Sequence, residues 1–262
     1  MLSLLLALAG GPAVPPSTFP ESLAAALEQD PAPAPAEEEK PPAWTGSVTI
    51  GGKYTSGNSD TRSGTASADA TLRRPDDRIT LGFLWLYDEN KNNAEKEWDL
   101  TDRKTQGSAQ YDYFFTKKTY AYAKAMFEND FQADLELRQT YSAGLGHQFV
   151  ENEELKLSAE AGLSWIDENF EESEDSEYLA ARGAYKVDWV ISKVWAFGQA
   201  VEVFPSLEKP KDVLVKGDTR VKATFTENFF GQVQWLYDWD STPADGKDRA
   251  DNQFLLSVGW KF

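Results

Sequence analysis

The chain ends with Phe254-Leu-Leu-Ser-Val-Gly-Trp-Lys-Phe262, and this stretch decides the fold. Its large side chains at every second position are those of Phe254, Leu256, Val258, Trp260 and Phe262. Successive side chains of a β-strand point to opposite faces, so these five residues share one face. The sequence therefore predicts a terminal strand with one apolar face that is rich in aromatic residues.

The same alternation of apolar and polar residues recurs along the chain from Trp44 onward. It predicts about twelve strands, over residues 44–54, 65–73, 79–87, 106–115, 118–129, 137–149, 155–165, 179–189, 193–203, 215–225, 229–239 and 254–262. In two of them, 118–129 and 193–203, the pattern leaves open which face is apolar. An even number of alternating strands is typical of a single-chain barrel in a bacterial outer membrane.

The predicted connections alternate in length. Short ones lie at 74–77, 116–117, 150–154, 190–192 and 226–228. The connections between them are modest at 56–61 and 130–134, and longer and polar at 88–102, 167–177, 205–212 and 240–251. Outer-membrane barrels have short turns at one end and longer loops at the other. A soluble β-sandwich has no reason to alternate so strictly.

Aromatic residues on the predicted apolar faces fall at two levels. With the termini at one end, the first level holds Trp44, Tyr113, Phe115, Phe149, Trp189, Trp260 and Phe262. The second level holds Tyr54, Trp85, Tyr87, Phe127, Trp165, Tyr237, Trp239 and Phe254. Trp and Tyr are enriched where a membrane meets water. Two such belts predict an all-β fold, a single antiparallel transmembrane β-barrel of about twelve strands.

Composition excludes several other classes. No run of about 18 apolar residues is present, which excludes a helical membrane span. The chain has no cysteine, so disulfides and thiolate metal sites are excluded. A net charge of -17 argues against nucleic acid as a partner. Residues 1–10 predict a signal peptide and 11–43, rich in Pro, Ala and Glu, a periplasmic linker, which leaves 44–262 as the barrel domain.

Several short motifs resemble the YdiY-like family of bacterial envelope proteins. These motifs are Trp44-Thr-Gly-Ser-Val48, Gly57-Asn-Ser-Asp-Thr61, Arg138, Gly144-Leu-Gly146 and Val258-Gly-Trp-Lys-Phe262. That family includes sequences labelled salt-induced outer-membrane proteins, and its domain has no assigned function. The resemblance spans residues 44–262 and implies a barrel fold and an outer-membrane location. It implies no active site, because its motifs are structural.

The terminal strand also resembles the assembly signal of bacterial outer-membrane barrels, which ends on an aromatic residue. Phe254, Leu256, Val258, Trp260 and Phe262 are therefore the candidate assembly signal. We expect the barrel assembly machinery to be a partner during insertion. Lipid and lipopolysaccharide of the outer membrane are the other expected partners.

Charged residues on the opposite, polar faces are the candidate lining of the barrel lumen. They are Asp69, Arg73, Asp112, Arg138, Glu160, Arg182, Lys186, Asp188, Asp218, Arg220 and Lys222. In a water-filled lumen such charges tune the selectivity for solutes. In a narrow or plugged lumen they pair into a network that stiffens the wall. We favour the paired network, because charges of mixed sign give no clear selective field.

No residue is predicted to be catalytic, to bind a cofactor or to ligate a metal. His147, the single histidine, shares its face with Leu145 and Phe149 and is predicted to face lipid. A hydrolase of the usual barrel types needs a histidine beside a nucleophile, so the chain is predicted not to be an enzyme. Gly144-Leu-Gly146 lacks the spacing of a nucleotide-binding loop. The acidic segment 238–248 has carboxylates that could hold Ca²⁺ but does not match the helix-loop-helix calcium pattern. The segment 168–177 is similarly acidic, and we favour solvated loops for both.

These features together predict an outer-membrane barrel of the cell envelope. Its predicted role is structural or stress-responsive, with a narrow passive pore as one form of that role. A porin-like channel for small solutes is the first alternative. A secreted soluble β-sandwich with a binding surface is the second.

Overall fold

The computed structural model describes residues 43–56, 60–91, 97–209 and 211–262. The strands in these ranges are β1 (Trp44–Thr55), β2 (Thr61–Arg73), β3 (Asp77–Lys91), β4 (Trp98–Phe114), β5 (Thr119–Asp130), β6 (Leu135–Glu151), β7 (Leu155–Phe170), β8 (Ser176–Val190), β9 (Trp195–Pro205), β10 (Val213–Thr224), β11 (Phe229–Asp240) and β12 (Ala250–Lys261). The predicted signal peptide (1–10), most of the predicted linker (11–42) and the middle of the first predicted connection (57–59) fall outside the described residues.

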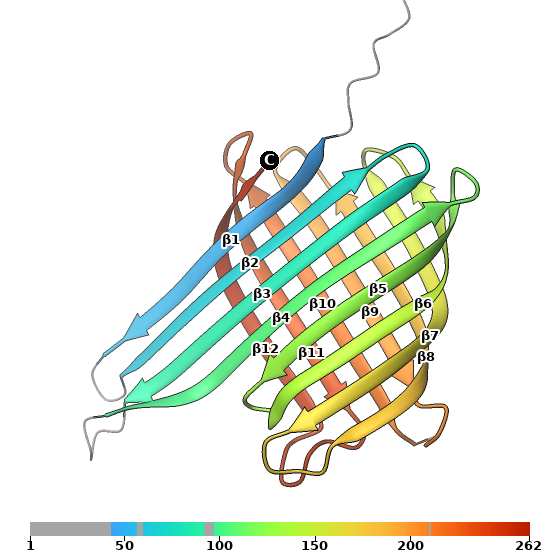
Figure 1. Cartoon of the computed structure of the whole chain (residues 1–262). Coiled ribbons are helices and arrows are strands. Elements are labelled where there is room, and N and C mark those ends of the chain that lie inside the picture. Colours follow the sequence, from blue (N-terminus) through green and yellow to red (C-terminus); the bar gives the residue numbers. More distant parts are fainter. Residues whose placement is uncertain (1–42, 57–59, 92–96, 210) are drawn as a thin grey trace, which may run out of the picture. The chain divides into compact units, whose positions relative to one another are not determined.

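The twelve strands form one closed barrel (Figure 1). Each strand pairs antiparallel with its neighbour in the sequence, and β1 pairs with β12 to close the sheet. Closure gives every strand a hydrogen-bonded neighbour on both sides, as a lipid environment favours. The prediction of an all-β antiparallel barrel is confirmed. Within the described ranges, no helix is long and apolar enough to cross a membrane.

The two faces of the wall differ as the alternation predicts. Outward side chains such as Leu81, Leu163 and Leu256 are apolar and exposed. Inward positions hold polar, charged and small residues, many of them buried. Of the two ambiguous strands, β5 turns Tyr120 inward. In β9, Phe204 is the buried inward residue.

Connections differ in length between the two ends of the barrel. At the end we call the turn end, the connections are residues 74–76, 115–118, 152–154, 191–194 and 225–228. At the opposite end, called the loop end, β9–β10 and β11–β12 are joined by residues 206–212 and 241–249. Two predicted long loops are wrong, because most of 88–102 and 167–177 is strand. There β3, β4, β7 and β8 continue as polar strands.

Aromatic side chains gather around the outside at the predicted levels. Near the loop end, Tyr141 packs between Phe127 and Trp165, with ring centroids 5.8 and 5.7 Å away. On the other side of the barrel, Trp235 stacks on Phe254 at 6.0 Å. Aromatic belts of this kind anchor a barrel at the membrane surface.

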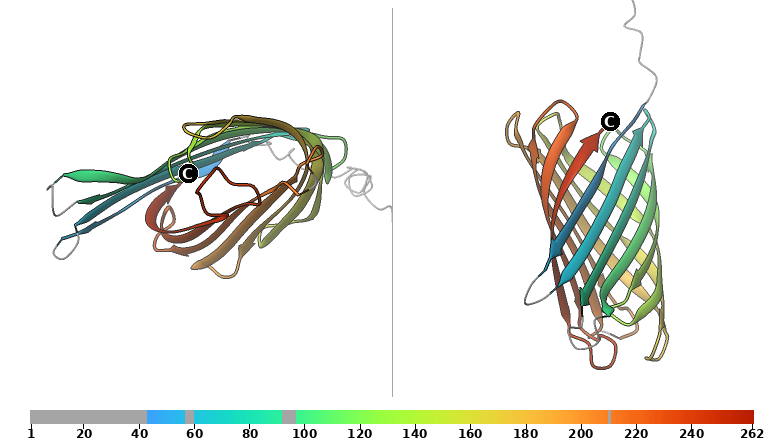
Figure 2. Two further views of the ribbon diagram at one scale, coloured as in Figure 1. Left: turned by 90° about the horizontal axis from the view of Figure 1, so that it is seen from below. Right: turned by 90° about the vertical axis from the view of Figure 1, so that its left-hand side faces the viewer.

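The contact between β1 and β12 is the shortest in the barrel. Only four residue pairs join them, from Ser47↔Lys261 to Ile50↔Val258, whereas β8–β9 has eight and β3–β4 fifteen. Gly46 and Phe262 extend the contact by exchanging two backbone hydrogen bonds of 3.0 Å. Figure 2 shows the loop-end tips of β1–β4 leaning away from the rest of the wall. We call the contact between β1 and β12 the seam.

A charge placed on the outer face should weaken the barrel far more than one placed inside. Leu163 of β7 is 59% exposed on the outer face, whereas Ser158 of the same strand faces inward. We expect Leu163→Arg to lower the free energy of unfolding by about 2–4 kcal/mol, as for arginine near the middle of a bilayer. Ser158→Arg should cost much less. Urea unfolding in lipid vesicles, followed by tryptophan fluorescence, measures both, and equal losses would contradict the assigned faces.

Candidate functional site: the barrel interior

The interior near the loop end is crossed by a network of buried charges. The Lys104 ammonium group lies 3.2 Å from Glu128 and 2.8 Å from Asp130, and it also pairs with Asp238. Lys216 lies 2.7 Å from Glu128 and 3.2 Å from Asp238. These ion pairs link β4 and β5 with β10 and β11 on the other side of the lumen. The Lys104 and Glu128 side chains are only 2% and 1% exposed, so water is excluded from the contact.

Arg138 of β6 extends this network along the wall. Its guanidinium group lies 2.5 Å from Glu168 on β7 and 3.4 Å from Glu128 on β5. A longer contact of 3.9 Å reaches Asp240 at the end of β11. We call the whole set the loop-end network: Lys104, Glu128, Asp130, Arg138, Glu168, Lys216, Asp238 and Asp240.

A second network, the central network, lies nearer the turn end. Arg182 pairs with Glu160 at 2.8 Å and with Glu202. Lys124 lies 2.5 Å from Glu202. Glu160 also accepts a hydrogen bond of 2.8 Å from the Tyr120 hydroxyl. A buried carboxylate is stable only when paired and hydrogen-bonded in this way.

A third set of contacts spans the inner side of the seam. Arg220 of β10 pairs with Asp218 at 2.6 Å and reaches Asp69 of β2 at 2.9 Å. Asp69 also accepts hydrogen bonds of 2.9 Å from the backbone N–H and the hydroxyl of Ser47 on β1. Side chains therefore connect β10 with β1 and β2 across the shortest ladder of the wall.

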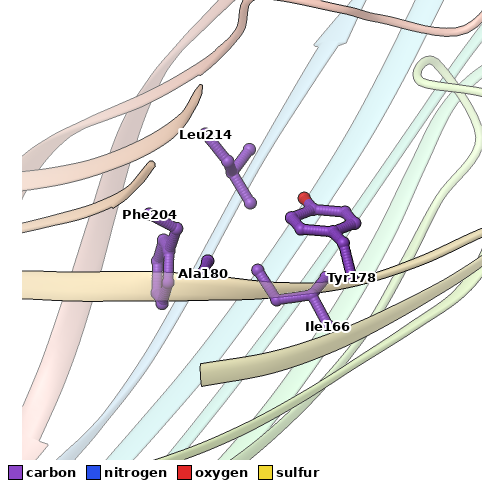
Figure 3. Close-up of a cluster of buried hydrophobic side chains, with 5 residues drawn as sticks. All are labelled: Ile166, Tyr178, Ala180, Phe204 and Leu214. Atoms are coloured by element: carbon purple, nitrogen blue, oxygen red, sulfur yellow. The ribbon is translucent and has the colours of Figure 1, made fainter. Parts of the chain in front are cut away.

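Apolar side chains fill much of the remaining interior. Figure 3 shows a cluster contributed by four consecutive strands, namely Ile166, Tyr178, Ala180, Phe204 and Leu214. A second cluster joins Leu84 and Leu86 of β3 to Leu236 of β11, with Leu255 of β12 against it. The interior around these residues is packed like a protein core rather than lined like a water-filled pore.

Toward the turn end the interior opens to water. Lys186 and Asp188 of β8 form an ion pair of 3.3 Å, and their side chains are 58% and 51% exposed. Arg73 lies over the ring of Phe114 at 3.7 Å, and Lys222 over the ring of Phe230 at 4.8 Å. The charged interior is thus buried at the loop end and solvated around β8 at the turn end. On the β4–β5 side of the turn end, Asp112 is buried and pairs with Arg78 at 2.6 Å.

The predicted lumen charges occupy different parts of this interior. Glu160 and Arg182 contact each other, as do Lys186 and Asp188, and Asp69 and Asp218 share Arg220. Arg138 and Asp112 instead pair with residues outside the predicted set, Glu168 and Arg78. Arg73 and Lys222 form no ion pair within the described residues.

The residues that the sequence prediction missed include the centre of the loop-end network. They are Arg78, Lys104, Lys124, Glu128, Asp130, Glu168, Glu202, Lys216, Asp238 and Asp240. Lys104 could have been predicted by extending the alternation of the fourth strand, because it shares its face with Gln106 and Ser108. Glu128 and Glu202 lie on β5 and β9, whose faces the sequence leaves open.

Two motif residues are placed on the wall. His147 faces outward, where its ring lies 5.1 Å from that of Phe149 and its Nδ1 is 3.0 Å from the Thr119 hydroxyl. Gly146 faces inward beneath Tyr120, and a Cβ atom at that position would lie 2.3 Å from the tyrosine ring. Glycine at this position makes room for a buried aromatic side chain. Its role is therefore in packing and not in binding a nucleotide.

One group of carboxylates has the spacing of a metal site. Oxygen atoms of Glu128, Asp130 and Asp238 lie within 4.8 Å of one another. Lys104 and Lys216 already pair with these three groups. Their ammonium groups take the position that a cation would need, so this cluster is a salt-bridge network.

A closed antiparallel barrel with an apolar, aromatic-belted outer face defines a β-barrel protein of the bacterial outer membrane. The chain belongs to the family described as a protein of unknown function, DUF481, whose model matches residues 48–262. A search of curated proteins found no match.

Solved structures similar to this chain include three outer-membrane proteins. The NanC porin is 11% identical, with a TM-score of 0.49, and the match covers 82% of this chain and 100% of that one. An outer-membrane channel from Pseudomonas putida is 12% identical, with a TM-score of 0.46 and coverage of 89% and 100%. The KdgM porin is 10% identical, with a TM-score of 0.41 and coverage of 84% and 99%.

Proposed function

We propose that this protein is a structural barrel of the outer membrane whose interior is sealed near the loop end. The loop-end network carries this proposal, because Lys104, Glu128 and Lys216 join opposite walls through buried ion pairs. A solute would have to break these pairs to pass, leaving unpaired charges in a space that excludes water. With the turn end in the periplasm, the solvated part of the interior would face the periplasm.

We also propose a stress-responsive role, which is supported only by the salt-induced label that some sequences of the YdiY-like family carry. Partners follow from the location. We propose that lipopolysaccharide surrounds the loop end and that the assembly machinery recognises the terminal strand. The outward aromatic residues and the exposed apolar face support contact with lipid.

A narrow passive channel is the second candidate function. The solvated Lys186 and Asp188 favour it, because they extend the aqueous space part of the way through the barrel. In this case the loop-end network would be a gate that opens transiently. The two candidates differ in conductance, which planar bilayers measure directly.

Conductance and melting temperature together test the sealed barrel. We expect the purified protein to give no steady conductance in a planar bilayer. Replacing Arg182 and Arg220 with Gln should lower the melting temperature, because Glu160, Asp69 and Asp218 lose their cationic partner and Glu202 keeps only Lys124. The conductance of this double variant should differ little from that of the parent protein. Steady current with a shift toward cations at an unchanged melting temperature would favour the channel, since the wall would have lost two positive charges.

A further inference from the structure

The inner face of β1–β4 carries a row of polar residues near the loop end. Lys53 of β1 pairs in register with Ser63 of β2, Ser63 with Asp88 of β3, and Asp88 with Asp102 of β4. Register partners in an antiparallel sheet point to the same face, with Cβ atoms about 4.5–5.5 Å apart. Two carboxylates therefore stand side by side on the inside of the wall.

This pair of carboxylates has no cationic partner in the described part of the chain. No lysine or arginine lies within ion-pair distance of Asp88 or Asp102 there, although 18 other ion-pair contacts are present, from Arg62–Glu89 to Arg220–Asp218. Lys53, the cation of the same row, is two strands away from Asp88, or about 10 Å between backbones. Like charges directly opposite each other destabilise a sheet, so the pair calls for a counter-ion.

Asp102 provides the second observation. It is only 5% exposed, and its Oδ2 accepts a hydrogen bond of 3.0 Å from the Gln253 amide of β12. Its other oxygen, Oδ1, is buried and accepts no hydrogen bond from the described residues. A buried carboxylate oxygen without a donor is costly and marks a position where a ligand gains most.

Asp88 and Asp102 line a cavity of about 320 Å³. Its other walls are polar and include Ser63, Asn90, Thr101 and Gln132, which offer hydroxyl and amide oxygens. Lys53 also lines the cavity, on the strand farthest from Asp102, and forms no ion pair with either carboxylate. Glu89 also borders the cavity, but its carboxylate is engaged by Arg62 and by the Tyr87 hydroxyl. The cavity thus joins two unpaired carboxylates with several neutral oxygen ligands.

We propose that this cavity binds a divalent cation of the Ca²⁺ type, with Asp88 and Asp102 as its charged ligands. Ca²⁺ takes six to eight oxygen ligands from carboxylates, carbonyls and water in flexible geometry, and a roomy site with two carboxylates suits it better than Mg²⁺. One divalent ion also neutralises both charges. With so few charged ligands, the affinity should be that of weak extracellular sites, with a Kd of about 10⁻⁴–10⁻³ M.

Calcium titration of the whole protein in detergent tests this proposal. After treatment with a chelator, saturable Ca²⁺ binding is measured by calorimetry at constant ionic strength, and the melting temperature is followed in parallel. We expect binding in the stated range and a melting temperature that rises with Ca²⁺ to a plateau. Asp88→Asn and Asp102→Asn should each weaken binding at least tenfold. Asp76→Asn, in a connection at the turn end, is the matched control and should bind like the parent chain.

The melting temperature without Ca²⁺ shows whether the variants still fold. Asp88→Asn removes one of two opposed charges, so it should melt at or above the temperature of the cation-free parent protein. A folded Asp88→Asn variant that binds Ca²⁺ as tightly as the parent would overturn the proposal. So would a parent protein that shows no saturable binding. Neither result depends on whether the barrel conducts.

Discussion

Replacing Lys104 with methionine is expected to lower the free energy of unfolding by about 3–5 kcal/mol, the usual effect of breaking a buried ion pair. The ammonium group of Lys104 contacts Glu128, Asp130 and Asp238, and its side chain is 2% exposed. Its loss leaves three carboxylates close together in a space that water hardly reaches. Lys216 remains beside Glu128 and Asp238 but does not pair with Asp130.

Equilibrium urea unfolding in lipid vesicles measures this loss. Lys186→Met is the matched control, because Lys186 also faces inward and pairs with a carboxylate but is 58% exposed. A solvated pair of this kind contributes about 0–1 kcal/mol. If both variants lose the same small amount of stability, the loop-end network is solvated in the membrane, and the argument for a sealed interior fails.

The strand faces could be predicted from the sequence, because a period of two is a local property. Lipid requires apolar side chains at every outward position within its thickness, so Leu155, Leu157 and Leu163 mark one face of β7. The same rule fails for β5, where tyrosines and alanines compete for the apolar face. The structure turns the tyrosines inward, where Gly146 of β6 and Gly162 of β7 make room for Tyr120 and Tyr122.

The polar strand ends could not be predicted, since the membrane no longer constrains them. Asp88–Asp102 has the composition of a loop, yet β3 continues to Lys91 and β4 starts at Trp98. A strand segment outside the membrane is held by backbone hydrogen bonds to the neighbouring strands. These bonds do not require apolar side chains at alternate positions. This is why Asp88 and Asp102 were not predicted to face each other.

The ion-pair partners of the inward charges could not be predicted from the sequence either. Lys104 meets Asp238 across 134 positions of sequence, and Arg220 meets Asp69 across 151. Strand parity states that both members of such a pair face the lumen. It does not give their height along the barrel or their distance across it, which depend on strand tilt and on the stagger between strands.

The terminal strand should be the least replaceable part of the barrel. We expect the double variant Trp260→Ser/Phe262→Ser to fail to reach the outer membrane and to be degraded in the periplasm. Val48↔Trp260 is one of the four register pairs of the seam, and Phe262 adds its two backbone hydrogen bonds with Gly46. The Phe262 ring also lies over Gly46, where a Cβ atom would be 3.0 Å from the ring. The shortest ladder of the wall therefore depends on the last residues of the chain.

The double variant Tyr113→Ser/Phe115→Ser controls for the general loss of aromatic anchors. Tyr113 and Phe115 lie at the same turn end and are 50% and 56% exposed, against 51% and 53% for Trp260 and Phe262. Tyr113 lies near the end of β4 and Phe115 in the connection that follows, both away from the seam. This variant should therefore still insert, with lower stability. Outer-membrane fractionation and the different gel mobility of unboiled and boiled samples measure insertion. Equal insertion of the two variants would show that the terminal residues serve only as part of the aromatic belt, and that closure of the seam does not depend on their side chains.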